Sequence, residues 1–101
     1  MYNINMGMIR FEWDENKNLI NIKKHGISFE EAKSVFYDPD ALVRDDPDHS
    51  DVEERFIILG FSSEANMLVV SHCYRDSEEV IRLISARKAT KNEEKQYHEY
   101  N

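Results

Sequence analysis

The sequence is poor in the residues on which several protein classes depend. It has one cysteine, Cys73, so neither an intramolecular disulfide nor a CxxC pair can form, which suits a reducing compartment. Its three glycines provide no Gly-rich phosphate loop, and there is no GxSxG elbow. No apolar run approaches the roughly 18 residues of a membrane span, and the N-terminus lacks the apolar stretch of a signal peptide. We therefore expect a cytoplasmic protein without a membrane segment.

Basic residues are outnumbered, but the excess of acid is local. The chain has 13 Lys and Arg against 20 Asp and Glu, a net charge of −7. Residues 38–54 contain eight of the acids and a single base, Arg44, so the remaining chain is neutral. Proteins that bind nucleic acid regardless of sequence are basic, because phosphate contacts supply their affinity. An anionic ligand would therefore have to meet a local cluster of bases.

Length and composition predict one packed domain. The 101 residues are 41% hydrophobic and 11% aromatic, enough for a core without disulfides. Residues 1–8 show no hydrophobic period, so we expect a flexible extension there and a single domain over residues 9–101.

Two helices are predicted near the N-terminus from their end signals. Asp14 can cap a first helix that ends at Gly26. Ser28 and Glu31 have the spacing of a capping box, in which the glutamate reaches back to the serine backbone. This second helix must end before Pro39.

The rest of the chain is predicted to form strands and a C-terminal helix. Thr90 and Glu93 have the spacing of a second capping box, and the helix they begin has so little apolar surface that we expect weak docking. Runs rich in β-branched and aliphatic residues predict five strands: Ile9–Trp13, Ala41–Arg44, Glu54–Phe61, Met67–Arg75 and Val80–Lys88. This order predicts an α+β fold with a mostly antiparallel sheet, two helices after the first strand and one at the C-terminus.

The predicted hairpin of the last two strands carries unusual polar side chains for core strands: His72, Tyr74, Arg75, Arg82 and Arg87. Arginine binds phosphate through a rigid fork, and histidine exchanges protons near neutral pH. RNA cleavage without a metal needs a base, an acid and cations for the developing negative charge. Alternation along a strand lets only one of the two arginines Arg82 and Arg87 face the same way as His72, unless a bulge intervenes.

Each of these features also has a structural explanation. Three arginines, Arg55, Arg82 and Arg87, could instead pair with acids at the strand ends: Glu53, Glu54, Glu78 and Glu79. Lys24 and His25 end the first helix, where cations complement the helix dipole. An acidic loop could bind a metal through Asp45, Asp48, His49 and Asp51, but it lacks the EF-hand spacing, and we expect no metal and no cofactor.

Four blocks of the chain resemble the BrnT toxins of bacterial type II toxin–antitoxin systems: FEWD, KHGISFEEA, EERFIILG and ISARKAT. The resemblance implies a RelE-like fold, ribonuclease activity that arrests growth, and neutralisation by a BrnA-type antitoxin with a ribbon-helix-helix DNA-binding part. The family pattern falls on eight residues: Lys24, His25, Glu54, Arg55, His72, Arg82, Arg87 and Lys88.

These observations predict a metal-independent endoribonuclease. The candidate catalytic residues are His25, Glu54, Arg55, His72, Arg82 and Arg87. The candidate RNA-binding residues are Lys24, Tyr74, Arg75 and Lys88. DNA would be contacted only through the antitoxin, and two toxins could meet in the assembled complex. The alternatives are a non-catalytic corepressor of the antitoxin and a metal-dependent nuclease that uses the acidic loop.

Overall fold

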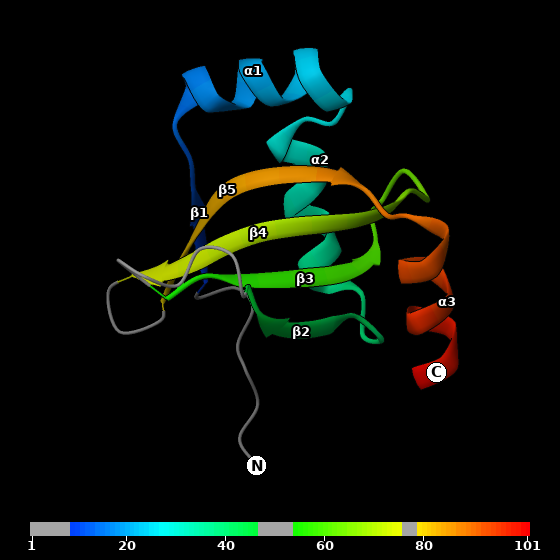
Figure 1. Cartoon of the computed structure of the whole chain (residues 1–101). Helices are drawn as coiled ribbons and strands as arrows, with labels where there is room; N and C mark the ends of the chain where they lie inside the picture. The colour runs from blue at the N-terminus through cyan, green and yellow to red at the C-terminus, as the bar shows by residue number, and fades with distance from the viewer. Residues whose placement is uncertain (1–8, 47–53, 76–78) are drawn as a thin grey trace.

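The computed structural model describes residues 9–46, 54–75 and 79–101 (Figure 1). Its elements are β1 (Arg10–Glu12), α1 (Glu15–His25), α2 (Phe29–Lys33), a 3₁₀ turn (Ser34–Tyr37), β2 (Leu42–Asp45), β3 (Phe56–Phe61), β4 (Met67–Arg75), β5 (Val80–Lys88) and α3 (Lys91–Tyr100). The sheet has the order β1-β5-β4-β3-β2; β1 pairs with β5 in parallel and the other pairs are antiparallel. The predicted α+β fold is confirmed, with a five-stranded mixed sheet.

The flexible extension predicted at residues 1–8 lies outside the described residues, and the single domain predicted over residues 9–101 stays a prediction. Within the described ranges, no helix has the length and apolar character needed to cross a membrane.

The first helix begins and ends as predicted. The Asp14 side chain accepts from the Asn16 N–H at 2.8 Å. Gly26 adopts the left-handed conformation with φ 73°, and its N–H donates to the Ile22 carbonyl at 2.8 Å. Glycine reaches this conformation without the steric cost of a side chain, so the chain can reverse between α1 and α2.

Only half of the capping box predicted for α2 forms. The Ser28 hydroxyl accepts from the Glu31 N–H at 3.0 Å, as expected. The Glu31 carboxylate instead accepts from the Ser62 hydroxyl and the Asn66 amide, both at 2.7 Å. The reciprocal bond was therefore predicted wrongly, because a tertiary contact with the β3–β4 turn takes the carboxylate. The 3₁₀ turn that follows α2 ends before Pro39, as predicted.

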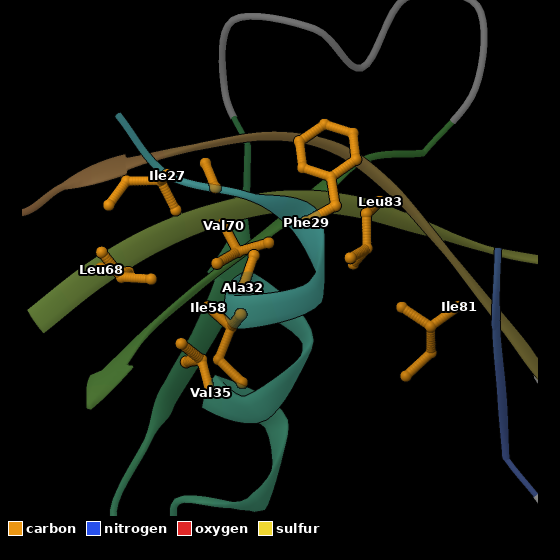
Figure 2. Packing of buried hydrophobic residues seen from close by; sticks show 10 residues of the cluster. Ile27, Phe29, Ala32, Val35, Ile58, Leu68, Val70, Ile81 and Leu83 are labelled. Carbon is orange, nitrogen blue, oxygen red and sulfur yellow. The ribbon is translucent and has the colours of Figure 1, made fainter. Parts of the chain in front are cut away.

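The main core lies between α2 and one face of the sheet, which we call the α2 face (Figure 2). Fully burying one large aliphatic or aromatic side chain contributes about 1.5–3 kcal/mol, so this cluster is the main apolar contribution to stability. Its buried members come from α2 and its entry and from β3, β4 and β5: Ile27, Phe29, Ala32, Val35, Ile58, Leu68, Val70, Ile81, Leu83 and Ala86.

A bulge decides which face each arginine of β5 uses. Ser71 pairs with Ser85 but His72 pairs with Leu83, so one extra residue of β5 is accommodated there. The register then places Arg82 opposite Cys73 and Arg87 opposite Val69. Because residues two apart on β4 share a face, both arginines lie on the face opposite α2, which we call the open face.

His72 lies on the α2 face and is fully buried. Its ring packs against Phe36, Tyr74 and Phe56, with centroids 4.8, 5.4 and 6.1 Å away. Its Nδ1 is 3.2 Å from the Val70 carbonyl, and its Nε2 has no hydrogen-bond partner in the described part of the chain. Burial lowers the pKa of His72 to about 4, which keeps the ring neutral at pH 7.

The C-terminal helix docks on the open face through one aromatic residue. Tyr97 is 5% exposed and packs with Leu59, Met67 and Val69. Its hydroxyl donates to Asp38 at 2.8 Å, and burial together with this bond raises the pKa of Tyr97 to about 12. The apolar surface of α3 is small, as predicted, but a buried polar anchor supplements it.

We expect Tyr97→Phe to lower the free energy of unfolding by about 1–2 kcal/mol, because it removes a hydrogen bond to a charged acceptor and keeps the ring. Tyr100→Phe is the matched control, since Tyr100 is 79% exposed and its loss of a hydroxyl should cost less than about 0.5 kcal/mol. Urea unfolding of both variants measures the difference. Equal losses would contradict the anchoring role.

We expect His72 to make the fold sensitive to acid. Its folded pKa of about 4 lies below the ordinary 6.5, so the unfolded chain binds the proton more readily. Its contribution to stability is complete above pH 6.5 and is lost as the pH falls through 4, up to about 3 kcal/mol. Comparing urea unfolding of the wild type and His72→Leu from pH 7 to 4 isolates the contribution of His72 to the free energy of unfolding. If the two free energies fall in parallel as the pH is lowered, His72 is not the cause of the acid sensitivity.

Candidate functional site

The open face carries a pocket of about 470 Å³, which we call the open-face pocket. The last turn of α1, the end of β2 and the first turn of α3 surround it, and β3, β4 and β5 form its floor. Its lining residues are Lys24, His25, Arg44, Asp46, Ile57, Val69, Ser71, Ser85, Ala86, Arg87 and Glu93.

A buried asparagine brings the end of α1 to this pocket. The Asn21 amide donates to the carbonyls of Ala86 and Ile27, both at 2.8 Å, and its carbonyl accepts from the Ala86 N–H at 3.0 Å. Residues three and four positions later lie on the same side of a helix. Lys24 and His25 therefore follow Asn21 toward β5 and line the pocket beside Arg87.

A bidentate ion pair orients Arg87. Its Nη1 and Nη2 donate to the two carboxylate oxygens of Glu93 at 2.8 and 2.9 Å. Glu93 Oε1 also accepts from the Thr90 N–H at 2.8 Å, and the Thr90 hydroxyl accepts from the Glu93 N–H at 3.2 Å. The predicted capping box at the start of α3 is confirmed, and the same glutamate aligns the arginine.

Both members of this pair remain charged over a wide pH range. The hydrogen bonds from Arg87 lower the pKa of Glu93 to about 2, against the opposing effect of burial. The hydrogen bond to Glu93 raises the pKa of Arg87. The pair is therefore a fixed structural feature at physiological pH.

The ion pair leaves part of the Arg87 guanidinium available. Its Nη1 also donates to the Lys88 carbonyl at 3.2 Å, so three of its five N–H groups have acceptors. Within the described residues, the Nε–H and one Nη2–H have none. These two donors are parallel and match two oxygens of one phosphate group. Glu93 thus holds the remaining edge of the guanidinium in a fixed orientation.

The pocket has a small positive charge. Lys24, Arg44 and Arg87 face two carboxylates, those of Asp46 and Glu93. The imidazole of His25 adds a group that can give and accept a proton. Ser71 and Ser85 lie opposite each other on the floor, since these residues are paired in the sheet. The pocket therefore combines cations, a group able to transfer protons and hydroxyls, a set of groups suited to binding an anion.

Three of the sequence candidates line the pocket, namely Lys24, His25 and Arg87. Two others lie on the segment that leads into β3. Arg55 is half-buried, and its carbonyl accepts from the N–H of the lining residue Asp46 at 2.9 Å. Glu54 is exposed and does not line the pocket.

The remaining candidates lie elsewhere. Arg82 pairs with Glu12 at 2.9 Å, and Arg75 approaches the same carboxylate at 3.5 Å. Tyr74 packs beside His72 on the α2 face, and the exposed Lys88 does not line the pocket. His72 thus shares a face with neither Arg82 nor Arg87.

The structural alternative expected the arginines to pair with acids, and two of them do: Arg82 pairs with Glu12 and Arg87 with Glu93. Two of the partners that it named, Glu53 and Glu78, lie outside the described residues. Glu12 faces Arg82 through the parallel pairing of β1 with β5, a contact between distant parts of the chain.

Of the four residues named for the metal alternative, Asp45 ends β2, and Asp48, His49 and Asp51 lie outside the described residues. Among the described residues, no group of three or more His, Cys, Asp or Glu is placed to hold a metal ion.

Five polar or charged lining residues were not among the sequence candidates: Arg44, Asp46, Ser71, Ser85 and Glu93. Arg44 could have been found from the sequence, because it is the single base in an acidic segment. Glu93 was recognised as a cap, but its contact with Arg87 depends on the turn between β5 and α3. The serines carried no signal, because their position depends on the register of the sheet.

Comparison with known proteins agrees with this architecture. Residues 13–93 match the family described as "Ribonuclease toxin, BrnT, of type II toxin-antitoxin system". The 1.1 Å crystal structure of the ribonuclease toxin BrnT from Brucella abortus is similar, with a TM-score of 0.60 and 24% sequence identity over 82% of this chain and 99% of that chain. No curated protein sequence matches significantly. The structural likeness shows the fold, and the family match spans most of the sequence: the chain belongs to the BrnT family of ribonuclease toxins of type II toxin–antitoxin systems.

Proposed function

We propose that this chain is an endoribonuclease that cleaves RNA in the open-face pocket without a metal ion. The observation that carries the proposal is the free Nε–H and Nη2–H edge of Arg87, which Glu93 holds beside Lys24 and His25. This arrangement can bind a phosphate and place a proton-transfer group next to it.

In the proposed reaction, Arg87 binds two oxygens of the scissile phosphate. The 2′-oxygen attacks phosphorus as its proton leaves, the bond to the 5′-oxygen breaks, and that oxygen takes up a proton. Lys24 and Arg44 offset the negative charge that grows on the phosphorane oxygens. His25 exchanges a proton with the 2′-hydroxyl or with the leaving oxygen.

The other candidates have supporting roles in this proposal. Arg55 and Glu54 would contact RNA at the pocket edge near β3. Arg75 and Lys88 would contact nucleotides beyond the cleaved bond. Tyr74, on the α2 face beside His72, and Arg82, bound to Glu12, make no RNA contact in this proposal. We assign no catalytic role to His72, because it is fully buried on the opposite face of the sheet.

The wider biology is part of the same proposal. A BrnA-like antitoxin with a ribbon-helix-helix part would neutralise the toxin in the cytoplasm and provide its only contact with DNA. Two toxins could be present in that complex. The RelE-like classification of the fold stays a prediction.

Replacing Arg87 by Ala should reduce RNA cleavage at least about 100-fold, because it removes the proposed phosphate contact. Arg82→Ala is the matched control on the same strand and should lower cleavage less than about threefold, since Arg82 is bound to Glu12 away from the pocket. Cleavage of a labelled RNA by purified protein in EDTA measures both.

Equal activity of the two variants would show that Arg87 does not hold the phosphate. Arg87→Lys separates charge from geometry: the lysine keeps the charge but lacks the fork, so we expect at least a tenfold loss. A wild-type chain that cleaves no RNA with or without metal would favour the non-catalytic corepressor.

Glu93→Gln should lower kcat about tenfold with a smaller change in KM. The glutamine oxygen can still accept from the Thr90 N–H and cap α3, but the glutamine amide N–H would face an N–H of Arg87, so the guanidinium would lose one of its two orienting bonds. The neighbouring Glu94→Gln is the control, since Glu94 is exposed in the first turn of the same helix. Single-turnover cleavage and thermal unfolding of both variants separate positioning from stability. A loss that follows only the melting temperature would contradict the positioning role.

A further inference from the structure

One acid of the open-face pocket has no role in the proposed reaction. Glu93 orients Arg87, but Asp46 is a second carboxylate in a pocket that is proposed to bind an anion. Asp46 is largely enclosed, since it is only 8% exposed. A carboxylate repels a phosphate, so Asp46 weakens RNA binding unless it contacts another part of the nucleotide. The bases of RNA carry N–H groups that a carboxylate can accept.

Asp46 lies on the same face of the sheet as the floor of the pocket. Its N–H donates to the Arg55 carbonyl at 2.9 Å, which continues the pairing of β2 with β3 beyond Asp45. Arg44 lies opposite Ile57 on the open face, and Asp46, two residues later, shares its side of the strand. The neighbouring Asp45 pairs with a residue of the α2 face and therefore lies on the opposite side.

The floor between Asp46 and Arg87 carries two aliphatic side chains. Ile57 on β3 pairs with Ser71 on β4, and Val69 lies two residues before Ser71 on the same side. Apolar side chains of this kind can cover one face of a nucleobase. The Ser71 hydroxyl adds a donor and an acceptor beside them.

The pocket is long enough for one nucleotide. β2 lies three strand spacings from β5, about 14 Å, because the order is β5-β4-β3-β2. Leu42 is the residue of β2 that the register places level with Arg87, and Asp46 lies four residues further along, about 13 Å. The Cα atoms of Arg87 and Asp46 are therefore about 19 Å apart across the face, and the two side chains take up part of this distance. The volume of about 470 Å³ is also ordinary for a small-molecule site.

We propose that Asp46 belongs to a guanine-binding subsite of the open-face pocket, an inference that rests on the proposed function. The base would lie on Ile57 and Val69, and the carboxylate of Asp46 would accept from the N1–H and the N2 amino group of guanine. These two N–H groups are adjacent and parallel, so one carboxylate can accept both, in addition to its contacts within the protein. Cleavage would then fall at phosphates that adjoin a guanosine.

The other three bases of RNA match a carboxylate less well. Adenine and cytosine have an amino group, but a ring nitrogen without hydrogen lies beside it, and its lone pair would face the second carboxylate oxygen. Uracil has one N–H group between two carbonyl oxygens, which a carboxylate repels. Guanine alone offers two neighbouring donors, so the subsite selects it by hydrogen bonding rather than by size.

Binding of nucleoside monophosphates to the full-length chain tests the subsite without any need for cleavage. Calorimetry should show guanosine monophosphate bound at least about tenfold more tightly than the adenosine, cytidine and uridine monophosphates. Inosine monophosphate, which differs from guanosine monophosphate only by lacking the N2 amino group, should also bind at least about tenfold more weakly, because one oxygen of Asp46 loses its donor.

Asp46→Asn should weaken guanosine monophosphate binding at least about tenfold and leave adenosine monophosphate within about twofold, because the asparagine amide would face a guanine donor. Asp45→Asn is the matched control and should keep these affinities, since Asp45 is exposed on the opposite side of the same strand. In labelled RNA that contains every dinucleotide step, the wild type should cut bonds that adjoin guanosine at least about tenfold faster than the others. Asp46→Asn should lose that selectivity.

The outcomes separate this inference from the proposed function. Equal affinity for guanosine and inosine monophosphates, or no detectable guanosine monophosphate binding, overturns the inference even if RNA is cleaved normally, and the proposed function then stands. Guanine-selective binding that Asp46→Asn removes supports the inference even if the wild type cleaves no RNA, which contradicts only the proposed function. Cleavage without regard to the adjoining base overturns the inference. If Asp46→Asn does not fold, the comparison of the two monophosphates in the wild type decides.

Discussion

The side chain of Asn21 determines where the candidate site lies. A buried amide is costly unless it is hydrogen-bonded, and here three bonds to Ala86 and Ile27 satisfy it. Ala86 is the residue before Arg87, and one helical turn after Asn21 come Lys24 and His25. The polar anchor therefore sets the distance between the two parts of the pocket. With Asn21 on the buried side of α1, the aliphatic residues Leu19, Ile20 and Ile22 are left 56, 63 and 40% exposed.

Two further constraints place Arg87 on the open face and orient its guanidinium. The bulge at Ser71 and His72 turns Arg87 to the open face while the neighbouring Ala86 remains in the core. The capping box at the start of α3 then fixes Glu93, which aligns the guanidinium. The second constraint depends on the docking of α3, because the glutamate can reach Arg87 only while Tyr97 holds the helix against the sheet. Site geometry thus depends on the C-terminal helix as well as on β5.

Sequence reasoning succeeded where the determinants are local. The ends of α1 follow from Asp14 and Gly26, and both strands of the hairpin have their predicted bounds. Three of the candidate site residues named from the sequence, Lys24, His25 and Arg87, line one pocket, but the fold places the other candidates outside it. His72 is buried on the other face, because alternation, the bulge and the position of α2 together decide its surroundings. The partner of Arg82 comes from β1, some seventy residues away, and no spacing rule indicates it.

The distribution of charge explains how an acidic protein can bind an anion. All of the excess acid lies in residues 38–54, and screening at physiological salt reduces its influence beyond about 8 Å. Even inside the pocket, Asp46 and Glu93 nearly balance the three cations, so the general attraction for RNA is weak. In the proposed function, the affinity for RNA would come from directed contacts, above all from the two remaining N–H groups of Arg87. A site of this kind depends on geometry rather than on total charge, so a residue such as Glu93, which reduces the charge of the pocket, can still strengthen phosphate binding by orienting Arg87.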